Sequence, residues 1–240
     1  MNERLSETWV YLAQSPLLWL TATVTTYALA EALYRRLRQA PFAHPVLVSI
    51  AVLVVILAAT RTPYPRYFEG AQFVHFLLGP AIVALAVPLH RELRRARAKA
   101  VPLTAALLAG SVTAAVTAVG VATLAGASRA SVVSLAPKSA TAPVAMGIAE
   151  KLNGIPSLSA ALVVLTGLLG TVLGPWLLRR LRVRDEAAVG FALGVASHGL
   201  GTARAFEIAE TAGAFAGLGM GLNAVATSVI VPILARVLIP

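Results

Sequence analysis

The sequence predicts an all-α polytopic membrane protein, and three observations lead to that class. Hydrophobic residues fill 58% of the 240 positions and charged residues only 12%. The mean hydropathy is +0.80. Several uncharged stretches are long enough to cross a bilayer, which takes about 20 apolar residues. A water-soluble helical bundle needs neither so much apolar surface nor such long uncharged stretches. We therefore expect a single integral membrane domain over residues 1–240.

Six uncharged stretches define the expected spanning helices. They cover residues 8–30, 39–60, 70–90, 100–128, 152–178 and 211–235. Two further apolar segments, at about 130–152 and 187–207, are interrupted by proline, glycine and basic residues. We expect each of these two segments to be re-entrant or a broken helix.

Three basic clusters predict the orientation, because cytoplasmic loops are enriched in Lys and Arg. They lie at 35–38, 91–99 and 179–184. The second and third clusters are separated by two full spans, so they share a side only if 130–152 enters and leaves from outside. By the same logic, 187–207 dips in from the cytoplasmic side. The alternative, in which both interrupted segments cross fully, places the third cluster outside, against the rule.

A faint internal repeat accompanies this organisation. Val87–Leu107 aligns with Ala142–Leu162, and Pro88 matches Pro143. Chance explains much of this in so Ala- and Leu-rich a chain. Inverted repeats with interrupted segments are nonetheless common in transporters and surround the binding site there.

The first interrupted segment contains "SLAPKSATAP", Ser134–Pro143, with a lysine between two prolines. A lysine at the centre of a span costs about 2.5–3.5 kcal/mol on insertion scales, so Lys138 either reaches the membrane surface or has a function. Its neighbours favour a function. The prolines free backbone groups from helical bonding, and two hydroxyls stand nearby; together these groups suit a bound anion. The candidate residues are Pro137, Lys138, Ser139, Thr141 and Pro143.

The second interrupted segment contains "SHGLGTAR", and we expect it to complete the same pocket. Its glycines permit a sharp turn, and its hydroxyls add hydrogen-bonding groups. Arg204 offers a planar fork that suits a carboxylate, although it could equally pair with Glu207. The imidazole of His198 could hold or release a proton, although a hydrogen-bonded core histidine is the plainer alternative. The candidates are Ser197, His198, Gly199, Gly201, Thr202 and Arg204.

Other residues carry weaker signals. Gln72 and His75 lie one helical turn apart and could share a face, and Asn223 stands alone in the last span; all three are candidates for additional lining. The chain has no cysteine, and its four histidines are too scattered to indicate a metal site. No nucleotide-binding loop is visible, so we expect no cofactor. The net charge of +10 lies in short loops without interleaved aromatics, which argues against nucleic acid.

Several segments resemble the LrgB/CidB family of bacterial inner-membrane proteins, related to the membrane domain of the plastidal glycolate/glycerate translocator. The similarity runs from about Pro41 onward and rests on "SLAPKSATAPVAM", "NGIPSL", "GPWLLRRLRVRD" and "ALGVASHGLGTARA". The chain differs at Ala142, where a second threonine is frequent, and at Ile82, where a polar residue is frequent. The resemblance implies a multi-pass protein of the bacterial cytoplasmic membrane that works with a small LrgA/CidA-type partner.

Two functions follow from the residues and the resemblance. The first is a secondary transporter of small carboxylates of the glycolate, glycerate or pyruvate kind, coupled to protons. The alternative is an antiholin- or holin-like regulator of murein hydrolase activity and cell lysis. We expect the protein to form homo-oligomers in the lipid bilayer in either case. An intramembrane hydrolase is a third reading, but no acid is evident to orient Ser197 and His198, so we expect no enzyme.

Overall fold

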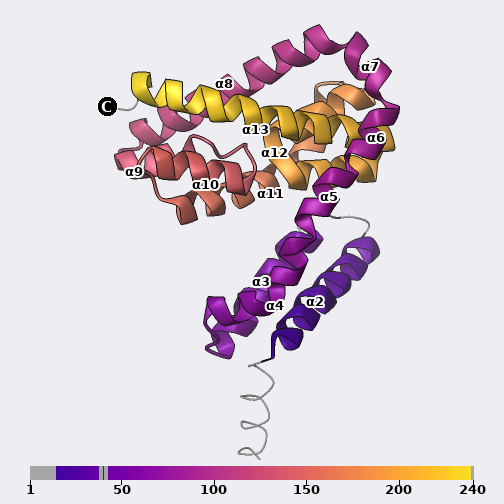
Figure 1. Ribbon diagram of the computed structural model, residues 1–240. Helices are drawn as coiled ribbons and strands as arrows, with labels where there is room; N and C mark the ends of the chain where they lie inside the picture. The colour runs from indigo at the N-terminus through magenta and orange to yellow at the C-terminus, as the bar shows by residue number, and fades with distance from the viewer. Residues whose placement is uncertain (1–14, 38–39, 41–42, 239–240) are drawn as a thin grey trace, which may run out of the picture. The chain divides into compact units, whose positions relative to one another are not determined.

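The computed structural model describes residues 15–37, 40 and 43–238, and every regular element in these ranges is a helix (Figure 1). The described chain falls into two compact units that divide after Ala84. The all-α polytopic class predicted from the sequence is confirmed.

The first unit contains α2 (Pro16–Arg36), α3 (Pro45–Ala59), α4 (Tyr64–Phe76) and α5 (Leu78–Ala84). Helix α2 packs on α3 and α4. Trp19 is buried there and meets the edge of Tyr67, with ring centroids 5.9 Å apart. A Cβ on Gly70 would lie 2.2 Å from the Pro16 carbonyl oxygen, so this glycine permits the close approach of α2 and α4.

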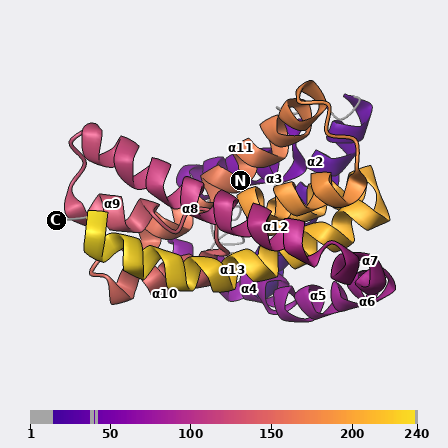
Figure 2. The same ribbon diagram turned by 90° about the horizontal axis from the view of Figure 1, so that it is seen from above.

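The second unit holds the interrupted segments, and its helices pack side by side (Figure 2). Helices α6 and α7 carry the second basic cluster, and α8, α11 and α13 are the long apolar helices. The bounds are α6 (Ala86–Arg91), α7 (Leu93–Ala98), α8 (Ala100–Leu124), α9 (Arg129–Leu135), α10 (Ala142–Lys151), α11 (Pro156–Arg180), α12 (Glu186–Ile208) and α13 (Glu210–Leu238).

Four helical stretches among the described residues are long and apolar enough to cross a membrane: Tyr64–Arg91, Ala100–Leu124, Pro156–Arg180 and Glu210–Leu238. They correspond to four of the six spans expected from the sequence. The other two differ. Helix α3 has only 15 residues, and α2 is more polar because it contains four threonines and Glu31. Residues 1–14, which hold the start of the first expected span, lie outside the described ranges.

The first interrupted segment is a hairpin of α9 and α10, hereafter the first hairpin (residues 129–151). Ser134 near the end of α9 accepts a 2.7 Å hydrogen bond from the backbone N–H of Ile155, at the start of α11. In one continuous helix these two residues would lie about 30 Å apart, at 1.5 Å per residue. The chain therefore turns back between α9 and α10, as a re-entrant segment does.

The second interrupted segment, α12, also folds back on itself, hereafter the second hairpin (residues 186–208). Ser197 and His198 depart from helical geometry, with φ −132° and ψ 17° at Ser197 and φ 43° and ψ −133° at His198. A Cβ on Gly201 would lie 2.2 Å from the Leu193 carbonyl oxygen. A straight helix would separate these residues by about 12 Å. The turn thus brings the second arm against the first.

Helix α13 then runs parallel to the first arm of the second hairpin. A Cβ on Gly190 would lie 1.9 Å from the Ala212 carbonyl oxygen, and a Cβ on Gly194 would lie 2.0 Å from that of Ala216. Both pairs advance by four residues, which fixes the parallel direction. Only glycine at these positions lets the two backbones approach so closely.

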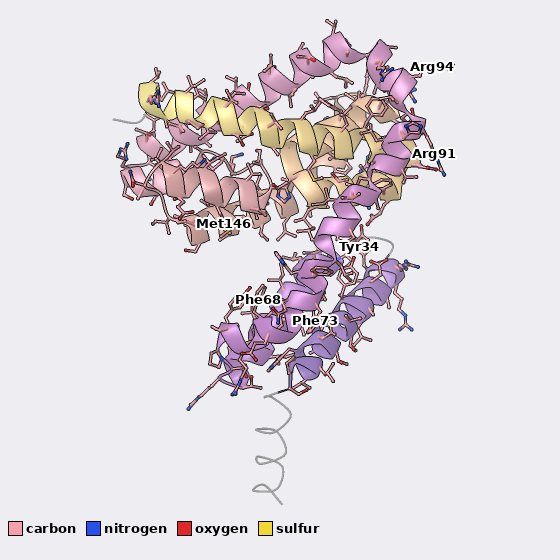
Figure 3. All side chains as sticks on the ribbon, viewed as in Figure 1. Tyr34, Phe68, Phe73, Arg91, Arg94 and Met146 are labelled. Atoms are coloured by element: carbon pink, nitrogen blue, oxygen red, sulfur yellow. The ribbon has the colours of Figure 1, made fainter. Side chains whose placement is uncertain are left out.

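Ion pairs gather the basic clusters at one end of the second unit, hereafter the basic end. Asp185, which directly follows the third cluster, pairs with Lys99 at 2.8 Å and Arg95 at 3.3 Å. Glu210, after the second hairpin, pairs with Arg91 at 2.8 Å. Arg91 and Arg94 lie together on α6 and α7 (Figure 3). Both ends of the second hairpin therefore lie at the basic end.

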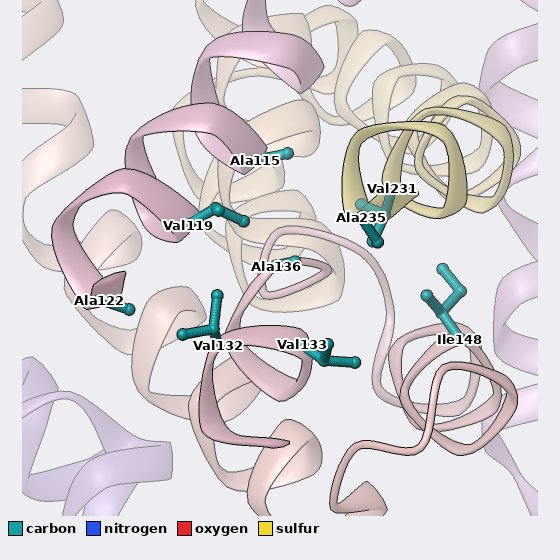
Figure 4. Packing of buried hydrophobic residues seen from close by; sticks show 9 residues of the cluster. All are labelled: Ala115, Val119, Ala122, Val132, Val133, Ala136, Ile148, Val231 and Ala235. Atoms are coloured by element: carbon teal, nitrogen blue, oxygen red, sulfur yellow. The ribbon is translucent and has the colours of Figure 1, made fainter. Parts of the chain in front are cut away.

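An apolar cluster closes the packing between α8, the first hairpin and the C-terminal half of α13 (Figure 4). It lies toward the end opposite the basic clusters, because α8 begins at the basic end and contributes its later turns. Its buried members are Ala115, Val119, Ala122, Val132, Val133, Ala136, Ile148, Val231 and Ala235.

This topology predicts that residues 182 and 129 lie on opposite sides of the membrane, with 182 in the cytoplasm. The chain contains no cysteine, so Arg182→Cys and Arg129→Cys each introduce a single thiol. An impermeant maleimide applied to intact cells should label position 129 and spare position 182 until the cells are opened. Labelling of position 182 from outside would contradict the hairpin reading of 129–151. Arg38, which the sequence also assigns to the cytoplasm, lies outside the described residues.

Candidate functional site

The two hairpins meet at the side chain of Asn223 on α13, which is 1% exposed. Its amide nitrogen donates to the carbonyl oxygen of Ser139 in the first hairpin, at 2.9 Å. The same nitrogen donates to the carbonyl oxygen of Val195 in the second hairpin, at 3.1 Å. Ser111 of α8 donates to the amide oxygen at 2.6 Å, and Thr227 at 3.3 Å. One side chain thus joins both backbone breaks and two long helices, and we call it the Asn223 junction.

Prolines explain why the first hairpin turns where it does. Helix α9 ends at Leu135, and the buried ring of Pro137 sits in the following turn without an N–H to continue the helix. Helix α10 begins at Ala142, and Pro143 lies in its first turn, where a missing N–H is tolerated. Thr141 is the residue before α10, but its hydroxyl makes no capping hydrogen bond.

The second break is held by His198, whose positive φ is unusual for a residue with a side chain. Its Nε2–H donates to the Val163 carbonyl oxygen of α11 at 2.9 Å, which fixes the proton on Nε2. Thr202 donates to the His198 carbonyl oxygen at 2.9 Å. A Cβ on Gly167 would lie 2.6 Å from the imidazole. The break is therefore shaped by a side chain wedged against α11.

A cavity of about 1050 Å³ lies between α8, α11 and the first arm of the second hairpin. Its inner end is polar and is formed where the two breaks meet, by Lys138, Ser139, Thr166 and Ser197. Its other end is formed by Lys99 and Asp185 at the basic end. The walls between are largely apolar and include Leu103, Ala106, Gly110, Leu169, Leu173 and Phe191.

Lys138 is the cation at the inner end of this cavity. Among the described residues, none accepts a hydrogen bond or ion pair from its ammonium group. The inner end also contains no carboxylate among its described lining residues. Ser197 is completely buried and its Oγ has no hydrogen-bond partner among the described residues. A half-buried ammonium and an unpaired hydroxyl both need partners, so this end of the cavity suits an anion with oxygen atoms.

The structure brings together some of the residues predicted from the sequence and separates others. Lys138, Ser139 and Ser197 line the cavity. His198, Gly201 and Thr202 instead hold the second break. Gly199 is exposed, and Pro137, Thr141 and Pro143 shape the first hairpin without lining the cavity. Asn223 forms the junction rather than the cavity wall.

Arg204 does not reach the cavity, contrary to the prediction that it faces a carboxylate there. It lies on the second arm of the second hairpin, beyond the turn, and pairs with Glu207 one helical turn away. The plainer alternative for Arg204, a partner of Glu207, is thus what the structure has. Gln72 and His75 are exposed on α4 of the first unit and are likewise absent from the cavity wall.

Sequence reasoning missed the contribution of α11. Thr166 lines the cavity, and the glycines nearby make room for the second break: a Cβ on Gly170 would lie 1.7 Å from Ser197 Oγ. The recurrence of glycine at 167, 170 and 174 on one helix was the available signal. Among the described residues, no group of three metal-binding side chains is found.

The end of the cavity at the basic clusters, hereafter the cavity mouth, contains an ion pair at the N-terminal ends of α8 and α12. Lys99 and Arg95 both approach Oδ2 of Asp185, while Oδ1 accepts from the backbone N–H of Ala188 at 2.9 Å and caps α12. The hydrogen bond from Lys99, followed by that from Ala188, lowers the pKa of Asp185 to about 2. The carboxylate is therefore ionised throughout the physiological range.

Comparison with known proteins assigns the chain to a family. The LrgB-like family matches residues 23–237, and the chain belongs to this family. It is 35% identical over 212 residues to YwbG of Bacillus subtilis, covering 88% of this chain and 94% of that protein. It is 31% identical over 218 residues to the holin-like protein CidB of Staphylococcus aureus strain N315, covering 91% and 95%. The chain is thus a multi-pass bacterial membrane protein. No solved structure matches it.

The Asn223 junction predicts a large effect of one substitution on stability. Asn223→Ala removes four hydrogen bonds and leaves two buried carbonyls unpaired, so we expect a loss of about 2–3 kcal/mol in unfolding free energy. Denaturation of purified protein in detergent measures it. Ser228→Ala is the control, because this exposed α13 hydroxyl bonds only within its own helix. Equal effects of the two substitutions would refute the junction.

The positive φ at His198 predicts an unusual order of stability for substitutions at this position. Glycine adopts positive φ without strain, so His198→Gly should be more stable than His198→Ala by about 1 kcal/mol. Within an ordinary helix the order is the reverse. Ala203→Gly, on the helical second arm, is the control and should destabilise. The same denaturation measurement tests the order, and an alanine variant as stable as the glycine variant would contradict the turn.

Proposed function

We propose that this protein is a secondary transporter of small carboxylates. The observation that carries the proposal is the Lys138 ammonium, which has no partner within the described ranges and lies at the polar inner end of a cavity, where two interrupted segments meet. In surroundings of reduced dielectric, a carboxylate requires a cation, and Lys138 supplies it. The hydroxyls of Ser139 and Thr166 are suited to the hydroxyl or keto oxygen of such a substrate.

The arrangement of the two hairpins supports transport across the membrane. The first hairpin approaches the junction from the end opposite the basic clusters, and the second approaches from the basic end. The cavity extends from the junction to the basic end, whereas the other direction is filled by the apolar cluster of Figure 4. In this proposal, the basic end of the cavity faces the cytoplasm.

The coupling ion in this proposal is a proton. His198 has the side chain at the second break whose unperturbed pKa lies nearest neutrality. Its ring touches α11 through Val163 rather than the cavity, so it would act by changing how the second hairpin packs. A homo-oligomer and an LrgA/CidA-type partner remain part of the proposal, as the family resemblance implies.

A second candidate function is that of a holin-like membrane component. The observation that favours it is the name of the CidB relatives, holin-like proteins. Such a component would act through its association with other membrane proteins and would need no substrate. An isolated cation at the end of a cavity has no role in that function, which is why we favour the transporter.

The transporter predicts that Lys138→Ala abolishes uptake of labelled glycolate into proteoliposomes. Removing a charge-assisted hydrogen bond costs about 1.5–3 kcal/mol, or roughly ten- to a hundredfold in affinity. Lys138→Arg should retain part of the activity because it retains the charge. Lys151→Ala is the matched control, since this exposed lysine lies at the end of the same hairpin.

Two results would contradict this prediction in different ways. Equal uptake by wild type and Lys138→Ala would show that Lys138 does not bind the substrate. If wild type transports no small carboxylate but its reconstitution releases a trapped dye from the vesicles, the holin-like function is the better one.

A further inference from the structure

The mouth of the cavity contains cations, as the inner end does, but at the mouth the cations are paired with a carboxylate. Lys99 and Asp185 both line the cavity, and Arg95 reaches the same carboxylate. Along the first arm of the second hairpin, Asp185 precedes Ser197 by 12 residues, which corresponds to about 18 Å of helix. The mouth is therefore a separate location from the inner end, at the other end of a largely apolar passage.

Asp185 occupies the mouth in the way that a small carboxylate would. Its Oδ2 accepts from Lys99 at 2.8 Å and from Arg95 at 3.3 Å. Arg95 also lies 3.9 Å from the carboxylate of Glu92, so its charge interacts with both Glu92 and Asp185. The two cations already bind a carboxylate in this geometry, and that carboxylate belongs to the chain itself.

The interaction is of a kind that a dissolved anion can replace. The side chains of Lys99 and Asp185 are 37% and 41% exposed, and ion pairs with such exposure are weak because water competes for both partners. Asp185 can also retain its bond to the Ala188 N–H through Oδ1 when Lys99 turns away. Neither the helix cap nor the fold depends on the pair remaining closed.

We propose that the cavity mouth is a second carboxylate-binding subsite, formed by Lys99 and Arg95, in which Asp185 is a tethered competitor. An arriving carboxylate displaces Asp185 and is held by the two cations before it passes to Lys138. This inference rests on the proposed transport function and adds a first binding station to it. Asp185 then lowers the affinity of the mouth for the substrate, because each arriving carboxylate must displace it.

The test uses three variants of the full-length protein in proteoliposomes, with labelled glycolate as the probe. Asp185→Asn removes the competing charge and keeps the cap, because asparagine caps as well as aspartate. Lys99→Gln removes one binding cation. Glu186→Gln removes the same charge one residue away, from an exposed side chain for which the structure gives no ion pair, and is the matched control.

We expect Asp185→Asn to lower the KM for glycolate about 1.5- to fivefold with little change in maximal rate, the range that one weak ion pair represents. Lys99→Gln should raise the KM, and Glu186→Gln should leave it unchanged. If Asp185→Asn behaves like Glu186→Gln, the tethered competitor is wrong.

A second measurement separates this proposal from the transport function. Modification of the Lys99 amine by an amine-specific reagent, followed by peptide mass spectrometry, should be slowed by glycolate, and at lower glycolate concentrations in Asp185→Asn. Protection of Lys99 without any uptake would leave the mouth subsite standing and overturn transport. Uptake without protection of Lys99 would overturn the mouth subsite and leave transport standing.

Discussion

The amide of Asn223 is the constraint on which the second unit depends. Two polypeptide segments are broken within the helical core, and each leaves a carbonyl oxygen without a helical partner. Lipid offers no hydrogen bond to such groups, so broken backbone is tolerated only where protein or water satisfies it. A single buried amide nitrogen satisfies both carbonyls, and its oxygen binds Ser111 and Thr227. The position of each hairpin is thereby tied to the other.

The cavity follows from that junction. Because the breaks meet there, Lys138 and Ser197 come to the same end of one space. Glycines on α11 leave room for the second break, and the apolar cluster between α8, the first hairpin and α13 closes the far side. The near side lies beside the basic clusters, where Asp185 and Glu210 form exposed ion pairs. The result is a passage with a cation at each end and a weakly polar middle.

The sequence predicted the helical class, the four long apolar helices and the segments that would break, because proline, glycine and uncharged length act locally. It also drew attention to Lys138, which lines the cavity, since a lysine within an apolar stretch is conspicuous. It could not place Arg204, because the turn at His198 decides whether residues after 201 face the junction or return to the membrane surface. Nor could it weigh Asn223 correctly. An isolated polar residue acquires its role only from carbonyls 84 and 28 residues away in the chain.

Both hairpins are synthesised before the side chain that satisfies them. Ser139 and Val195 both precede Asn223 in the chain, and α13 is the last helix described. Until α13 has entered the bilayer, both breaks have exposed carbonyls that hydrocarbon cannot solvate. The re-entrant segments must therefore wait in the interface or in the insertion machinery while the long helices are laid down.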